Sequence, residues 1–96
     1  MNYKLTEIES ELLKEHKINP SEFFYRDLGE HFNMNDGIMS RGIYNILVST
    51  RDLKLWAHGM KPHRNWYVSD VKTYFGIKGN KDKLVKQIEI LREVFL

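Results

Sequence analysis

The sequence contains no cysteine among its 96 residues, which excludes disulfide bonds, thiolate metal sites and a thiol nucleophile. It also lacks a long hydrophobic run. The longest stretch without a charged residue, residues 42–50, is far shorter than the roughly 20 residues needed to cross a bilayer. The N-terminal segment is charged almost at once, unlike a signal peptide. These absences predict a soluble protein with no membrane contact, and the lack of cysteine fits a reducing cytoplasm.

Catalytic patterns are missing as well. No serine stands in a nucleophile-elbow motif, which would present it on a sharp strand-to-helix turn. Glu7, Glu11 and Glu15 recur at helical spacing, which is typical of a solvated helix face and not of an acid–base pair. Asp70 and His63 are a conceivable dyad, but the sequence gives no distance between them. We therefore expect a non-catalytic protein without a cofactor.

The formal net charge of +2 hides a strong asymmetry. Residues 1–50 carry five Lys and Arg against eight Asp and Glu, whereas residues 51–96 carry ten against five. Within residues 54–86, eight basic residues stand against two acidic ones. Such an asymmetry indicates an acidic support and a basic working surface. The alternative is that these lysines only keep a small domain soluble.

Helix signals run through most of the chain. Thr6 followed by Glu9 is a capping-box pattern. Asn19 followed by Pro20 places a cap residue before a proline at the first helical position. Apolar residues recur at helical spacing after each start, and Asn80 is expected to cap the last helix. The expected helices span about residues 6–16, 20–32, 38–56, 69–75 and 81–96.

Residues 38–56 hold the longest periodic pattern and are expected to form the central buried helix. The stretch IYNILVST within them has strand propensity, but its period and length favour a helix. Gly42 is expected to mark a close helix crossing. The composition of residues 33–37 predicts a turn before this helix, and Ser69 is expected to cap the short helix after it. The apolar residues 94–96 either pack on the core or form an oligomer contact.

These elements predict an all-α fold, a single-domain bundle of about five short helices over residues 1–96. Acidic helices in residues 1–50 are expected to form its first part. A basic helix–loop–helix in residues 51–96 is expected to form the second.

The segment of residues 58–66 contains glycine and proline and has no helical period, which predicts a loop. Its KPHRNW stretch interleaves basic and aromatic side chains, as in sites that stack a base and hold its phosphate. The alternative is a surface loop whose Trp66 packs into the core while Lys61 and Arg64 stay exposed. The two histidines of this segment have no cysteine or nearby carboxylate beside them, so no metal site is expected.

The stretch YFGIKGNKDKLV, residues 74–85, raises the question of a phosphate-binding loop. Gly76 and Gly79 are too close for a Walker loop, which also needs lysine directly after its second glycine. A Rossmann fingerprint needs a preceding strand and a third glycine. The Gly-x-x-Gly clamp of KH domains matches these letters. However, Asp82 stands where that pattern has an apolar residue, and no three-stranded sheet is expected.

A purely structural interpretation explains most of this stretch. Gly76 can end one helix in the left-handed conformation, Gly79 can relieve a tight connection, and Asn80 can cap the next helix. The lysines remain unexplained, because Lys81 and Lys83 in the first turn of a helix are electrostatically unfavourable. Cations kept at that end indicate a bound anion, which exposed amides and the helix dipole also attract.

Residues 68–88, VSDVKTYFGIKGNKDKLVKQI, resemble the SAP motif. That family joins two short helices through an extended Gly-Leu…Gly-x-Lys connection followed by a Leu-Val pair. Residues 76–77, 79–81 and 84–85 take these places here, with a shorter loop and a shorter first helix than the family usually shows. SAP modules commonly bind DNA. The nucleic-acid contact that the resemblance implies lies near Lys78, Lys81 and Lys83.

We therefore expect a small nucleic-acid-binding or accessory protein that contacts DNA or RNA phosphate through its basic C-terminal half. The alternative is a protein-interaction or oligomerisation domain that uses the acidic first half or the apolar C-terminus. The plain composition, rich in lysine, asparagine and aromatics, is in the style of a phage or bacterial accessory protein. The residues expected at the nucleic-acid interface are Lys54, Lys61, Arg64, Lys72, Lys78, Gly79, Lys81, Lys83 and Lys86.

Overall fold

The computed structural model describes residues 3–35 and 37–96, which form five helices and one hairpin. The helices are α1 (Glu7–Glu15), α2 (Glu22–Leu28), α3 (Arg41–Ala57), α4 (Val68–Phe75) and α5 (Lys81–Phe95). The strands β1 (His31–Met34) and β2 (Gly37–Ser40) pair antiparallel, with Met34 opposite Gly37. The mostly helical fold expected from the sequence is confirmed. The expectation of an all-α fold is wrong only in that it did not include this small β-hairpin.

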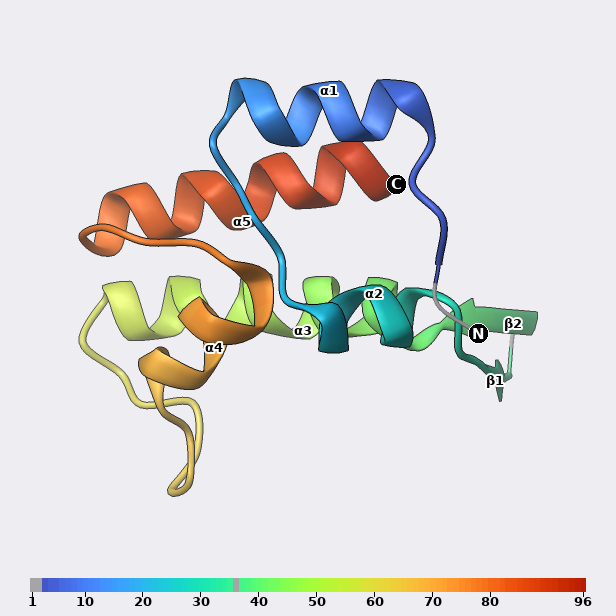
Figure 1. The fold of residues 1–96 in the computed structure, drawn as a ribbon. Helices are drawn as coiled ribbons and strands as arrows, with labels where there is room; N and C mark the ends of the chain where they lie inside the picture. Colours follow the sequence, from blue (N-terminus) through green and yellow to red (C-terminus); the bar gives the residue numbers. More distant parts are fainter. Residues whose placement is uncertain (1–2, 36) are drawn as a thin grey trace.

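The helices pack in layers around α5 and α3 (Figure 1). α5 lies between α1 on one side and α3 on the other, and it runs antiparallel to both. α2 packs against both α3 and α4, and the hairpin projects at the end where α3 begins (Figure 1). Within the described part of the chain, no helix has both the length and the apolar character needed to cross a membrane.

The core is centred on Phe24 of α2, whose side chain is fully buried. Its ring centroid lies 5.7 Å from that of Tyr74, 5.4 Å from that of Phe75 and 5.5 Å from that of Phe95. Phe95 therefore packs on the core, as one of the two expectations for the apolar C-terminus has it, whereas Leu96 beyond it is exposed. The other fully buried large side chains among the described residues are Phe75, Ile46, Leu53, Leu84, Ile88 and Leu91.

Several local signals of the sequence act as expected. The capping box of Thr6 and Glu9 forms both of its hydrogen bonds. Gly76 ends α4 in the left-handed conformation with φ of 64°, and Asn80 caps α5 by accepting the Lys83 amide at 3.0 Å. Gly42 is a close approach, since a Cβ there would lie 2.8 Å from the Leu28 amide nitrogen. α3 can therefore cross the end of α2 only at a residue without a side chain.

The connection between α1 and α2 is bound to the end of α4, and this changes where α2 begins. The Asn19 amide donates to the Gly76 carbonyl at 3.3 Å, and the Ser21 hydroxyl donates to the Tyr74 carbonyl at 2.8 Å. Asn19 is therefore held away from the helix start. Ser21 caps α2 by accepting the Phe24 amide at 3.4 Å, so the expected start at Asn19–Pro20 is wrong.

Three further helix boundaries differ from the expectation. The helix expected over residues 20–32 ends at Leu28, because the chain turns there into the hairpin, and residues 38–40 belong to β2. Ser40 caps α3 by accepting the Ile43 amide at 3.5 Å. α4 starts one residue before Ser69, after an N-cap residue that makes no side-chain cap. Asp36, within the expected turn, lies outside the described residues.

A partly buried hydrogen-bond network joins α2, α3 and α4. The Tyr74 hydroxyl donates to Oδ2 of Asp27 at 2.6 Å and accepts from Nδ2 of Asn45 at 2.9 Å. The Asp27 side chain is buried, and its other oxygen pairs with Arg26 at 3.2 Å. Burial, together with the neighbouring Asp27 carboxylate, raises the pKa of Tyr74 well above its ordinary value of 10.0.

Replacing Tyr74 by phenylalanine is expected to lower the free energy of unfolding by about 1–3 kcal/mol, because the buried Asp27 carboxylate and the Asn45 amide each lose a hydrogen bond. The stabilisation from the raised pKa is complete below about pH 10 and is lost at higher pH, since the unfolded chain ionises first. Urea denaturation of both proteins at pH 8 and pH 11 should therefore show a smaller difference at the higher pH. Tyr44→Phe, at a partly exposed tyrosine, is the control. An equal loss in the control contradicts the prediction.

Candidate nucleic-acid interface

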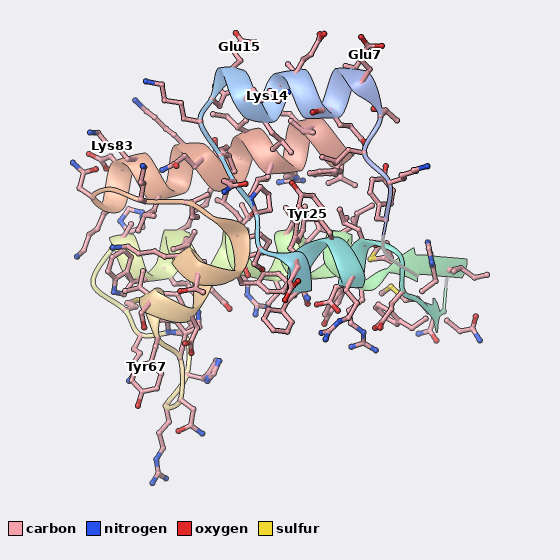
Figure 2. All side chains as sticks on the ribbon, viewed as in Figure 1. Glu7, Lys14, Glu15, Tyr25, Tyr67 and Lys83 are labelled. Carbon is pink, nitrogen blue, oxygen red and sulfur yellow. The ribbon has the colours of Figure 1, made fainter. Side chains whose placement is uncertain are left out.

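The basic residues of the C-terminal half concentrate where α5 begins. Lys81 and Lys83 lie in the first turn of this helix, and Figure 2 shows Lys83 at the end of the molecule that the start of α5 forms. One hollow of the surface contains Lys83 and another contains Lys81. The two hollows therefore flank the same helix start.

The first hollow, here called the lysine hollow, has a volume of about 590 Å³. It is formed by the end of α1, the connection between α4 and α5, and the first two turns of α5. Basic side chains dominate it. Its lining residues are His16, Lys17, Lys78, Gly79, Lys83, Lys86 and Gln87.

The side chain of Gln87 braces the connection that carries Lys78. Nε2 of Gln87 donates to the Lys78 carbonyl at 2.6 Å and to the Lys83 carbonyl at 2.9 Å. Its Oε1 accepts from the Lys78 amide at 3.3 Å. The connection is further shaped by Gly79, whose φ of 119° relieves the tight turn as expected. The backbone of Lys78 is thus fixed beside α5 by these hydrogen bonds.

Lys17 joins this hollow from the acidic half of the chain, and the sequence did not predict it. It follows α1 with a positive φ of 56°, a conformation that few residues other than glycine adopt. The next residue, Ile18, is buried in the core, and Asn19 is bonded to Gly76. Lys17 is therefore placed beside Lys78 by contacts between distant segments, which no local pattern reveals.

Within the described part of the chain, the lysines of this hollow carry charge without an ionic partner. Among the residues that the structure describes, the ion pairs involve Arg26, Arg41, Arg51 and Lys54, and none involves a lysine of the hollow. No carboxylate among the described residues lines the hollow either. This arrangement of cations can hold an anion.

The second hollow, here called the aromatic hollow, has a volume of about 430 Å³. Nζ of Lys61 lies 4.9 Å from the ring centroid of Tyr67, and Nζ of Lys81 lies 5.2 Å from that of Trp56. Trp66, another lining residue, is buried, as in the alternative in which it packs into the core, and its ring centroid lies 5.9 Å from that of Trp56. The lining residues are Trp56, Gly59, Met60, Lys61, Trp66, Tyr67, Val68 and Lys81.

Three of the nine expected interface residues lie in neither hollow. Nζ of Lys54 pairs with Glu89 at 3.3 Å, in a part of the surface that also includes Glu93. Arg64 is exposed in the loop between α3 and α4, and Lys72 is half-buried on α4. The structure thus brings six of the nine residues to the start of α5, four in the lysine hollow and two in the aromatic hollow.

Comparison of the chain with known proteins found no similar protein. No protein-family model matches the chain, and neither curated proteins nor solved structures gave a match. The SAP resemblance of residues 68–88 therefore stays a hypothesis, although α4, its connection and α5 supply two helices with an intervening loop at these positions.

Proposed function

We propose that the protein binds the phosphate backbone of nucleic acid through the lysine hollow and the first turn of α5. The observation that carries this proposal is the meeting of Lys17, Lys78, Lys83 and Lys86 around one hollow. These lysines come from three separate segments of the chain. None of them forms an ion pair within the described residues.

Electrostatics favours an anion at this place. Like charges repel one another, and the start of a helix adds partial positive charge from its free amides. Asn80 satisfies the Lys83 amide, while Asp82 is the acidic residue in the first turn. A phosphate group would neutralise the lysines and accept from the remaining amides of the helix start. The successive phosphates of one nucleic-acid strand could neutralise the lysines of both hollows.

Binding should therefore depend steeply on salt. The two hollows hold six lysines: Lys17, Lys61, Lys78, Lys81, Lys83 and Lys86. If these neutralise about six phosphates, affinity should fall roughly a thousandfold between about 50 and 200 mM salt. The measurement is fluorescence anisotropy with short labelled single- and double-stranded DNA and RNA across that range.

The triple variant Lys78→Glu/Lys83→Glu/Lys86→Glu tests the place of binding. It should bind at least a hundredfold more weakly at about 50 mM salt, and its salt dependence should be shallower by about three phosphates. The matched control is Lys4→Glu/Arg41→Glu/Arg92→Glu, which lowers the net charge equally at exposed positions outside both hollows. Circular dichroism checks that both variants fold.

Two results would contradict the proposal. An equal loss in the triple variant and its control would show that net charge alone, and not the lysine hollow, attracts the nucleic acid. No binding to any of the probes at about 50 mM salt would exclude the function. In that case, a molecular mass that rises with concentration would favour the alternative of an oligomerisation domain.

A further inference from the structure

The aromatic hollow holds two lysines over aromatic rings. Lys61 lies over Tyr67, and Lys81 lies over Trp56. Neither lysine forms an ion pair within residues 3–35 and 37–96. The Tyr67 side chain is 57% exposed, so its ring contacts Lys61 at the open surface. In the free protein, each ring is thus an electrostatic partner for one ammonium group.

A phosphate would compete successfully for these lysines. An ammonium group gains more from a charge-assisted hydrogen bond to a phosphate oxygen than from an exposed aromatic ring. The lysine stem is flexible and lets the ammonium group turn to a new partner. When phosphate approaches Lys61 or Lys81, the lysine is therefore expected to leave its ring. The ring face that it covered then becomes free apolar surface beside a bound phosphate.

A nucleic-acid base has the shape and chemistry to occupy that surface. Bases stack on aromatic side chains in proteins that bind single strands. The hollow offers two such rings, those of Trp56 and Tyr67, with Met60 and Val68 beside them and no carboxylate among its described lining residues. The lysine ammonium group would thus move from the ring to the phosphate. A base would then stack on the ring face that the lysine had covered.

We propose that the aromatic hollow stacks an unpaired base, and that the nucleic acid bound by this protein is single-stranded. A duplex can offer its phosphates to the lysines, but its bases are already paired and stacked and reach a ring only if they flip out. Lys81 of the aromatic hollow and Lys83 of the lysine hollow lie in the same turn of α5. One strand can therefore follow both hollows. This inference rests on the proposed phosphate binding and adds the class of ligand to it.

The test compares the affinity for a labelled oligodeoxythymidylate with the affinity for a duplex of equal length at low salt. A length of about twelve nucleotides lies within the range that single-strand-binding sites cover. The single strand should bind at least about tenfold more tightly than the duplex. Tyr67→Ala should remove most of this preference by weakening the single strand about tenfold, with little effect on the duplex. Tyr67→Phe, which keeps the aromatic ring, should retain the preference for the single strand.

Tyr44→Ala is the control, because this tyrosine is also partly exposed but packs beside Phe32 of the hairpin. If the protein bound the single strand and the duplex with equal affinity, and Tyr67→Ala changed neither, the base-stacking proposal would be wrong. The binding of the duplex would still support phosphate recognition. Binding of neither probe would overturn both proposals. A loss of both probes in Tyr67→Ala with unchanged circular dichroism would also overturn stacking, because it would assign Tyr67 to phosphate binding.

Discussion

Replacing Gly76 by alanine is expected to lower the free energy of unfolding by at least about 4 kcal/mol. Two costs add at this position. The left-handed conformation, with φ of 64°, costs a residue with a side chain about 1–2 kcal/mol. In addition, the new Cβ would overlap the carbonyl group of Asn19 and lie 2.7 Å from the backbone nitrogen of Pro20. These are backbone atoms, so no side chain can move aside to relieve the overlap.

The matched control for Gly76→Ala is Gly59→Ala. Gly59 also has a positive φ, of 85°, but a Cβ there would meet no heavy atom within 4 Å. Gly59→Ala should therefore lower the free energy of unfolding only by the cost of the left-handed conformation, about 1–2 kcal/mol. Urea denaturation followed by circular dichroism measures both. Equal losses in the two variants would show that the contact between Gly76 and Asn19 does not constrain the fold.

Replacing Phe24 by alanine is expected to cost about 3–5 kcal/mol, because it leaves a cavity among aromatic rings. The whole free energy of unfolding of a domain is about 5–15 kcal/mol, so the variant should be close to unfolded. Phe24 contacts rings from α4 and α5, so the loss should affect the packing of both helices. The urea midpoint and the thermal midpoint should both fall sharply.

Its neighbour Phe23 provides the control for Phe24. The Phe23 side chain is 53% exposed and carries the Arg26 guanidinium 5.2 Å from its ring centroid. Phe23→Ala should therefore cost less than about 1 kcal/mol. If the two alanine variants unfolded at the same urea concentration, the core would not be centred on Phe24.

The helices could be predicted from the sequence because their signals are local. The Thr6–Glu9 capping box, the Asn80 cap and the left-handed Gly76 depend on residues within one turn, and all three were confirmed. The start of α2 could not be predicted in this way. Asn19 is a residue type that often caps helices, but its backbone is held by Gly76, a residue far away in the sequence.

The hairpin was missed although the sequence contains a signal for it. Phe32 and Met34 alternate with polar residues, and the turn composition after them ends in Gly37. Such a turn between apolar residues is typical of a hairpin. The helices expected over residues 20–32 and 38–56 instead reach into the two strands from either side of the expected turn, because strands of four residues give too little periodicity to compete.

The candidate site could be predicted only where its residues are neighbours in the sequence. Lys78, Lys81 and Lys83 lie close together in the sequence, and cations at a helix start are unfavourable unless an anion binds there. Lys17 and Trp56 reach the two hollows through tertiary packing. Lys54 has the same local character as the others, but Glu89 on a facing helix neutralises it.

The position of α5 between α1 and α3 has a consequence for how the chain folds during its synthesis. α1 is made first among the helices, yet the helix on which it packs is made last. Until α5 leaves the ribosome, Phe24 has no Phe95 beside it and α1 lacks the helix on which it packs. The nascent chain is therefore expected to stay open and sensitive to proteases until α5 is complete. The helices should then close in one cooperative step, slower than in bundles whose neighbouring helices are also neighbours in sequence.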